Sequence, residues 1–203
     1  LLRKGSAIKV EIILPEGKER ALKTSNEAFG VVDGLSIIGT QAKVQISASP
    51  DQLKNCKEIL QNKCSKSNFD GRLTFVIGEN GMDLALQFGL PVHQIIKTGN
   101  WLGPLLVAAA EKDVKQLLLF GYHGKLVKLS GGIFHTHHHL ADGRLEILTS
   151  LAVKEGISFD LINLISKSTS VENALLTLEA SNPEAVSLIW ERMAKEIEIK
   201  SRS

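Results

Sequence analysis

The sequence predicts an α/β fold in which a parallel sheet is covered by helices on both faces. Three short and continuously apolar segments, residues 73–77, 92–96 and 115–120, have the length and composition of buried strands. Each is followed by a turn that contains glycine and then by a stretch of helical character. Strands that alternate with helices are typical of a parallel sheet, because the helix returns the chain to the end of the sheet where it started.

The region before these strands predicts further elements. Residues 7–14 alternate apolar and polar side chains, which favours a strand, and residues 30–40 are β-branched and bounded by glycine, which favours a second one. A proline close to a helix start predicts a helix from residue 49 to about residue 64. Residues 65–71 (SKSNFDG) have the composition of a linker.

The helices that follow the strands are expected at residues 82–88, 101–112 and from residue 125. From about residue 140 the pattern is helical throughout, and Ser-Asn-Pro-Glu at 181–184 begins a last amphipathic helix. Residues 188–190 on that helix are predicted to face either the core or a second copy in a homo-oligomer. The expected division is 1–64, 65–71 and 72–203.

Composition and charge exclude several functional classes. Apolar residues make up 43% and charged residues 23%, which are ordinary values for a globular protein, and the net charge of +2 gives no general indication of nucleic acid or of an anionic membrane. The apolar run 102–110 is too short to cross a bilayer. No secretory signal is visible, and two cysteines eight residues apart, Cys56 and Cys64, are expected as free thiols in a cytoplasmic protein. Because Leu1 replaces the usual methionine, we expect the chain to begin inside a longer protein.

All three turns between a strand and the next helix carry glycine. The residues concerned are Gly78, Gly81, Gly99, Gly121 and Gly124. In an open α/β sheet, ligands bind beyond the carboxyl ends of the strands, where helix N-termini offer free N–H groups. Three such turns predict a rim suited to a nucleotide-like ligand, although none has the dinucleotide or P-loop pattern.

Two lysines follow the third turn at helical spacing. Lys125 and Lys128 lie at i and i+3 and therefore share one helical face. Two ammonium groups beside a glycine turn suit a carboxylate or a phosphate. A solvated basic face explains the pattern equally well.

A histidine cluster follows, and it allows three interpretations. Its members and the acidic residues after it are His135, His137, His138, His139, Asp142 and Glu146. The spacing resembles that of binuclear metallohydrolases, but the aspartate comes after the last histidine and no second ligand cluster follows. One or two of the imidazoles can instead cap the next helix, or His135 and His137 can exchange protons near neutral pH.

Long motifs give this chain a family resemblance. Residues 99–148 contain Gly99-Asn100-Trp101, GYHGKLVK at 121–128 and GIFHTH at 132–137, and residues 22–40 contain LKTSNEAFGVVDGLSIIGT. Together these segments closely resemble the cobalt-precorrin-5B C(1)-methyltransferase family, the CbiD proteins of anaerobic cobalamin biosynthesis. Residues 39–43 depart from the family pattern, which has a further glycine there, and the family's glycine/threonine/alanine-rich opening is missing.

The resemblance implies methyl transfer from S-adenosylmethionine to ring carbon C-1 of a cobalt-containing corrinoid precursor. It also implies a Rossmann-like α/β domain preceded by the remnant of an α+β domain. The methyl donor is expected on the glycine rim, at Gly78, Gly81, Thr98, Gly99 and Asn100. The acetate and propionate groups of the substrate are expected at His123, Lys125, Lys128 and Arg144.

The resemblance also assigns roles to the histidine cluster. His135 and His137 are expected to handle a proton, with Asp142 or Glu146 orienting an imidazole. The cobalt arrives inside the tetrapyrrole substrate, so no metal of the protein's own is expected, nor any nucleic-acid or membrane partner. The alternatives are a binding module that holds a corrinoid or nucleotide without turnover and a metal-dependent hydrolase built on the histidines.

Overall fold

The computed structural model describes residues 11, 13–22, 34–35, 50–137 and 140–203. The chain divides into two units, residues 1–44 and 45–203. In the first unit, α1 (Gly17–Ala21) follows a turn in which the N–H of Gly17 donates to the carbonyl of Leu14 at 2.9 Å. The two strands expected at 7–14 and 30–40 fall mostly outside the described residues.

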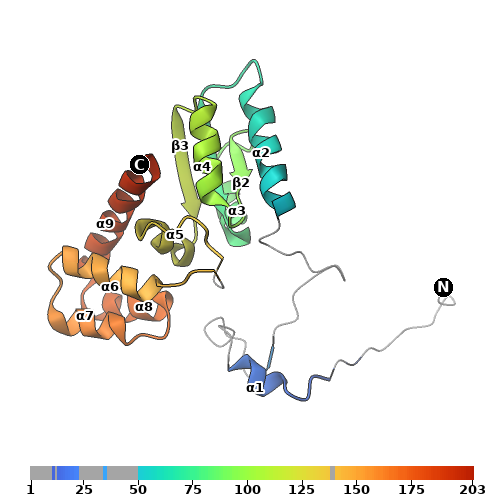
Figure 1. Ribbon diagram of the computed structural model, residues 1–203. Coiled ribbons are helices and arrows are strands. Elements are labelled where there is room, and N and C mark those ends of the chain that lie inside the picture. The colour runs from blue at the N-terminus through green and yellow to red at the C-terminus, as the bar shows by residue number, and fades with distance from the viewer. Residues whose placement is uncertain (1–10, 12, 23–33, 36–49, 138–139) are drawn as a thin grey trace. The chain divides into compact units, whose positions relative to one another are not determined.

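The second unit contains, within its described part, a three-stranded parallel sheet in the order β2-β1-β3 (Figure 1). Its strands are β1 (Arg72–Ile77), β2 (Ile95–Lys97) and β3 (Gln116–Gly121). The predicted α/β class with a parallel sheet is therefore confirmed. The order 2-1-3 occurs in one class of doubly wound sheets. In the dinucleotide-binding class the order is 3-2-1, so the third strand lies beside the second and not beside the first.

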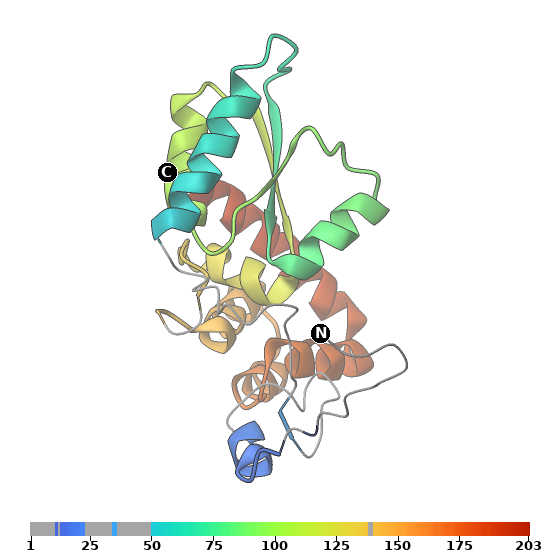
Figure 2. The ribbon, with the colours of Figure 1, turned by 90° about the vertical axis from the view of Figure 1, so that its right-hand side faces the viewer.

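Helices cover the two faces of this sheet, as its topology requires. The chain leaves β1 through α3 (Glu79–Gln87) to reach β2, then crosses back over β1 through α4 (Leu102–Glu111) to reach β3. Right-handed crossovers in opposite directions place their helices on opposite faces. Figure 2 shows α3 on one side of the strands and α4, with α2 (Pro50–Cys64), on the other.

The side chains of β1 alternate between two cores of unequal size. Phe75 and Ile77 point into the larger core, which contains residues of α2 and α4, whereas Val76 packs with Ile95 and Ala85 on the α3 side. All five are buried, as a strand covered on both faces requires.

The remaining helices pack against the larger core. They are α5 (His123–Ser130), α6 (Arg144–Lys154), α7 (Phe159–Ser166), α8 (Val171–Ser181) and α9 (Pro183–Arg202). The expected start of the last helix is confirmed, because Asn182 accepts from the N–H of Ala185 at 3.1 Å and Pro183 stands in the first turn. Ile189 is fully buried in the core.

Several expected boundaries differ from the structure, and the helices expected from residues 82 and 125 begin at Glu79 and His123. Residues 91–95 begin with a turn, in which Gln94 donates to the carbonyl of Pro91 at 2.9 Å, so β2 starts at Ile95 rather than at residue 92. Helix α2 packs on α4 and β2 and buries Leu60, so it belongs with the sheet and not with the N-terminal unit. The segment 65–71 therefore joins two elements of one unit. Among the described helices, none is both long and apolar enough to cross a bilayer.

Candidate functional site

The candidate site lies at the carboxyl edge of the sheet, where the connections from the strands diverge. With the order β2-β1-β3, one crossover leaves β1 to one side and the next returns past it to the other. In open α/β sheets, ligands bind at such a switch point, beyond the carboxyl ends of the two strands concerned, here β1 and β3. The turn after β1 begins at Gly78, and the turn after β3 contains Tyr122.

Gly78 has a backbone conformation that only glycine adopts readily. Its φ of 88° and ψ of 165° lie in a region closed to other residues by the Cβ atom. A Cβ at this position would lie 3.7 Å from Nζ of Lys125, on α5. The predicted donor-binding turn and the predicted substrate-binding lysine are therefore neighbours.

Gly81 has a packing role that accounts for the absence of a side chain. A Cβ there would lie 3.0 Å from Cγ1 of Val76 and 3.4 Å from Cα of Gly121. The first turn of α3 thus lies close to β1 and β3. The donor-binding role of Gly81 stays a prediction.

The turn after β2 is held firmly against β1. The N–H and the hydroxyl of Thr98 both donate to the carbonyl of Val76, at 3.0 and 3.2 Å. Gly99 follows with a φ of 58°, and a Cβ on it would lie 2.9 Å from Nε2 of Gln52, on α2. A side chain at position 99 would be strained and would meet Gln52.

Asn100 connects this turn to α5 and to residues 134–142, which we call the histidine segment. The residue is buried, and its Oδ1 accepts from Nζ of Lys125 at 3.2 Å and from Oγ1 of Thr136 at 2.9 Å. Its carbonyl also accepts from the N–H of Thr136 at 3.2 Å. One amide side chain therefore links two predicted site elements.

Main-chain hydrogen bonds extend the contact between the turn after β2 and the histidine segment. Trp101 and His135 form an antiparallel bridge, and the N–H of Gly103 donates to the carbonyl of Phe134 at 3.1 Å. Residues 134–136 are thus paired to residues 100–103. The histidine segment is attached directly to the turn on which we expect the methyl donor.

Lys128 is a buried cation with protein partners. Only 2% of the residue is exposed, and its Nζ donates to the carbonyls of Ala141 at 2.7 Å and of Thr136 at 3.3 Å. Burial lowers the pKa of this ammonium, although Asp142 opposes the shift. In this structure Lys128 fixes both ends of the histidine segment, and its substrate-binding role stays a prediction.

His135 is held in an unusual environment. Its ring meets the Trp101 ring edge-on with centroids 4.6 Å apart, and both of its ring nitrogens are buried without a hydrogen-bond partner in the described part of the chain. Nε1 of Trp101 and Oε1 of Gln52 share this lack of a partner. Burial lowers the pKa of His135, with a contribution from nearby His137, whose ring centroid is 6.4 Å away. The proton-handling role of these two histidines stays a prediction.

Asp142 and Arg144 pair with each other. Two parallel hydrogen bonds of 2.8 and 2.7 Å join the guanidinium to the carboxylate, and they lower the pKa of Asp142 to about 2. Asp142 also accepts from the N–H of Gly143, the N-cap of α6, at 2.9 Å. Glu146 is exposed one turn further on. The capping group at this helix start is therefore a carboxylate and not one of the described imidazoles.

His123 has the carboxylate partner that we expected for His135 or His137. Its Nε2 lies 2.9 Å from Oε2 of Glu172 on α8, and the hydroxyl of Tyr122 donates to the same oxygen. Burial lowers the pKa of His123, while Glu172 acts in the opposite direction. The sequence analysis missed Glu172, Tyr122 and Gln52, and no local pattern identifies the first, because it lies 49 residues from its partner.

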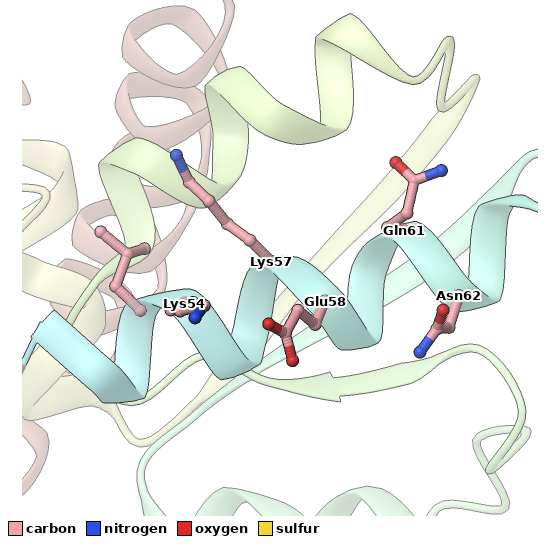
Figure 3. A pocket seen from close by; sticks show the side chains of 6 residues that line it. Lys54, Lys57, Glu58, Gln61 and Asn62 are labelled. Carbon is pink, nitrogen blue, oxygen red and sulfur yellow. The ribbon is translucent and has the colours of Figure 1, made fainter.

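Other depressions lie away from these residues. Figure 3 shows one along α2, where Lys54, Lys57, Glu58, Gln61 and Asn62 project from successive turns. An apolar groove of about 820 Å³ lies between α4, β3 and α9. Neither is lined by a predicted site residue.

The described residues do not bring metal ligands together. No group of three or more His, Cys, Asp or Glu side chains among them has the arrangement that a metal ion needs. His138 and His139 lie outside the described residues.

Two family models match the chain. Residues 1–46 match the model described as CbiD, and residues 135–203 match the one described as CbiD, C-terminal domain. The chain belongs to the CbiD family. The resemblance inferred from the motifs around residues 99–148 is thereby confirmed.

Curated relatives support the same assignment along the whole chain. A cobalt-precorrin-5B C(1)-methyltransferase of Prochlorococcus marinus (strain NATL1A) is 85% identical over 203 residues, which make up 100% of this chain and 53% of the relative. Its counterpart in strain MIT 9303 is 58% identical over 201 residues, 99% of this chain and 52% of the relative. The one from Synechococcus sp. (strain CC9902) is 53% identical over 203 residues, 100% of this chain and 56% of the relative. The CbiD chain described here spans about half the length of these relatives, and no solved structure matches it significantly.

Proposed function

We propose that this CbiD-family chain takes part in methyl transfer from S-adenosylmethionine to C-1 of a cobalt-precorrin. The observation that carries this proposal is the match to methyltransferases of that name over 98–100% of the chain. We place the protein in the cytoplasm, where its substrates are made, and we leave open its assembly as a homo-oligomer.

The methyl donor is proposed to bind along the carboxyl edge of the sheet, in a Rossmann-like manner. The turns after β1 and β2 bring main-chain groups to this edge at two glycines, Gly78 and Gly99, whose positive φ values of 88° and 58° are readily adopted by glycine. The neighbouring donor-site candidates are Gly81, Thr98 and Asn100. The turn after β2 is hydrogen-bonded to Val76 of β1 through Thr98 and to Lys125 of α5 through Asn100, so its conformation is fixed before a ligand binds.

The tetrapyrrole is proposed to bind beside the donor at the carboxyl edge of the sheet, next to α5. Its carboxylate substituents suit Lys125 at the end of the first turn of α5 and the guanidinium of Arg144. A Cβ on Gly124 would lie 4.0 Å from Nη1 of Arg144, which places this cation near the start of α5. Lys128 and His123 complete the set of substrate-side candidates.

The chemical step needs little more than alignment. C-1 forms a bond to the methyl carbon while the methyl–sulfur bond breaks, and the electron pair goes to sulfur, which becomes a neutral thioether. The macrocycle gains one positive charge and returns to its former charge by losing a proton. Holding carbon, methyl and sulfur in line accounts for most of the acceleration.

The histidine segment is proposed to face the macrocycle. His135 and His137 are the candidates for proton handling, with Asp142 and Glu146 near the start of α6. The cobalt is part of the substrate, so it does not require ligands from the protein.

The test is a calorimetric titration of S-adenosylmethionine into the chain after treatment with a chelator. We expect binding in the micromolar range and its loss in Gly99→Ala. Gly156→Ala is the matched control, because Gly156 also has a left-handed φ, 67°, but has nothing within 4 Å of its Cβ position. Both substitutions strain the backbone, by about 1–2 kcal/mol, and Gly99→Ala additionally meets Gln52, so binding is compared only after circular dichroism shows that both variants are folded.

Each outcome of the titration has a separate meaning. Equal weakening in the two variants would contradict the placement of the donor on the β2–α4 turn. Binding without methyl transfer to the corrinoid would favour a binding module. Tightly held stoichiometric zinc before chelation would instead favour the hydrolase alternative.

A further inference from the structure

We propose that Glu172 is a positioning residue that holds His123 as the proton acceptor of the methyl-transfer step. This inference rests on the proposed methyl transfer and revises one of its roles. It assigns the proton to a different imidazole from those of the histidine segment. Neither Glu172 nor Tyr122, which shares its carboxylate oxygen, was expected in the site.

The position of His123 suits such a role. It is the first residue of α5 and directly follows the turn at the carboxyl end of β3, one of the two strands at the switch point of the sheet. Lys125, two residues further on, lies beside Gly78 at the end of β1. His123 therefore belongs to the same edge of the sheet as the proposed donor and substrate residues.

The imidazole is held from three sides. Glu172 accepts at 2.9 Å from Nε2, the Tyr122 ring lies with its centroid 3.9 Å away, and the Trp190 ring on α9 lies 5.8 Å away. Only 17% of the His123 side chain is exposed. A ring held in this way has one orientation.

Glu172 is itself on a rigid support. It stands in the first turn of α8, where Oγ of Ser170 accepts from the N–H of Asn173 at 3.1 Å and caps the helix. Val171 and Ala174, on either side of it, are buried in the core. The carboxylate is therefore fixed relative to the core rather than carried by a loop.

The carboxylate determines which ring nitrogen carries the proton. A neutral imidazole that donates from Nε2 has its lone pair on Nδ1. Within the described residues Nδ1 has no protein partner, and it is not one of the buried polar atoms. It can therefore accept the proton that the macrocycle releases, and the resulting imidazolium is stabilised by Glu172.

The charged and titratable groups near His123 come from three elements. Glu172 lies on α8, the phenol of Tyr122 lies in the preceding turn, and Arg144 begins α6 close to Gly124. The element α9 presents the uncharged Trp190. Tyr122 keeps its proton over the working range, because burial and Glu172 raise its pKa to about 12. Glu172 is therefore the group whose removal changes His123 most.

The first experiment observes the imidazole itself, without reference to turnover. Long-range ¹H–¹⁵N NMR of the chain labelled at histidine, with the signal assigned by loss in His123→Asn, is expected to show the Nε2–H form. In Glu172→Gln and Glu172→Ala the pKa of His123 should fall, because the negative charge that raises it is gone. Glu179→Gln, an exposed position on the same helix, is the control and should leave the signal unchanged.

The second experiment measures the single-turnover rate of methyl transfer against pH. The limb on which the rate rises with pH should move to lower pH in Glu172→Gln, and the plateau should fall about 10-fold or more in Glu172→Ala. If Glu172→Ala unfolds, the isosteric glutamine variant still reports on the limb. An Nδ1–H form in the wild-type chain, or an unmoved limb in Glu172→Gln, would overturn the proposal. Absence of transfer at every pH, together with the expected NMR result, would count against the proposed function instead.

Discussion

The two histidines closest to the sheet edge lie in opposite chemical environments. His123, after β3, has a carboxylate on one nitrogen and leaves the other accessible, whereas His135, paired to the turn after β2, has both nitrogens buried and unpartnered within the described chain. A buried polar atom without a hydrogen bond costs about 1–3 kcal/mol. The first environment is complete in the isolated protein. The second lacks hydrogen bonds within the described residues, and a polar ligand at the edge of the sheet is a partner that the proposed function would provide.

Removing the amide that anchors the His135 segment should have the largest effect. Asn100→Ala deletes the acceptor for Lys125 and Thr136 inside the protein, so we expect a loss of about 2–3 kcal/mol in the free energy of unfolding. Urea denaturation followed by circular dichroism measures it. Asn62→Ala, at an exposed position on α2 (Figure 3), is the control and should change stability by less than about 0.5 kcal/mol. Equal effects of the two changes would mean that Asn100 does not anchor the segment.

Replacing each histidine by phenylalanine contrasts the two environments directly. His123→Phe removes a hydrogen bond to a carboxylate and should cost about 1–2 kcal/mol. His135→Phe removes two buried atoms that have no partner and keeps the edge-on contact with Trp101, so stability should stay within about 0.5 kcal/mol of the wild type or rise. The same denaturation experiment gives both values. A similar loss in both variants would show that the nitrogens of His135 are hydrogen-bonded in solution.

The smallest effect is expected at the far end of the histidine segment and depends on pH. The pKa of Asp142 in the folded chain is about 2, below its ordinary value of 3.8, so its pairing with Arg144 stabilises the fold above pH 4 and is lost as the pH falls towards 2. Asp142→Asn should therefore be less stable than the wild type at pH 7, by no more than about 1 kcal/mol because the pair is half-exposed. Thermal unfolding at pH 7, 4 and 2.5 should show this difference shrinking. A difference that is constant with pH would contradict the ionic origin of the stabilisation.

The sequence was most informative where local pattern determines structure. The apolar run at 73–77 became the central strand, with its side chains divided between two cores. Lys125 donates to Asn100 and Lys128 to Thr136, two residues that are themselves hydrogen-bonded. The start of β2 was misplaced because Val92 is apolar but lies in an exposed turn. Asp142 was expected to orient an imidazole, yet the arginine two residues away is its partner.

Contacts made only by tertiary packing could not be foreseen. Glu172 reaches His123 because α8 packs beside α5, and Gln52 reaches Gly99 because α2 packs on α4 and β2. Neither residue carries a motif. The turns at Gly78 and Gly99 were predicted correctly, whereas Gly81, Gly121 and Gly124 lie in α3, β3 and α5, and Gly81 serves close packing.

The pairing of residues 134–136 with residues 100–103 has a kinetic consequence. Main-chain hydrogen bonds at Asn100 and Gly103 couple the two segments without an intervening flexible side chain. A displacement of either segment is therefore expected to move the other with it. The two segments should accordingly open together in amide hydrogen exchange, with similar exchange rates at Gly103 and Thr136.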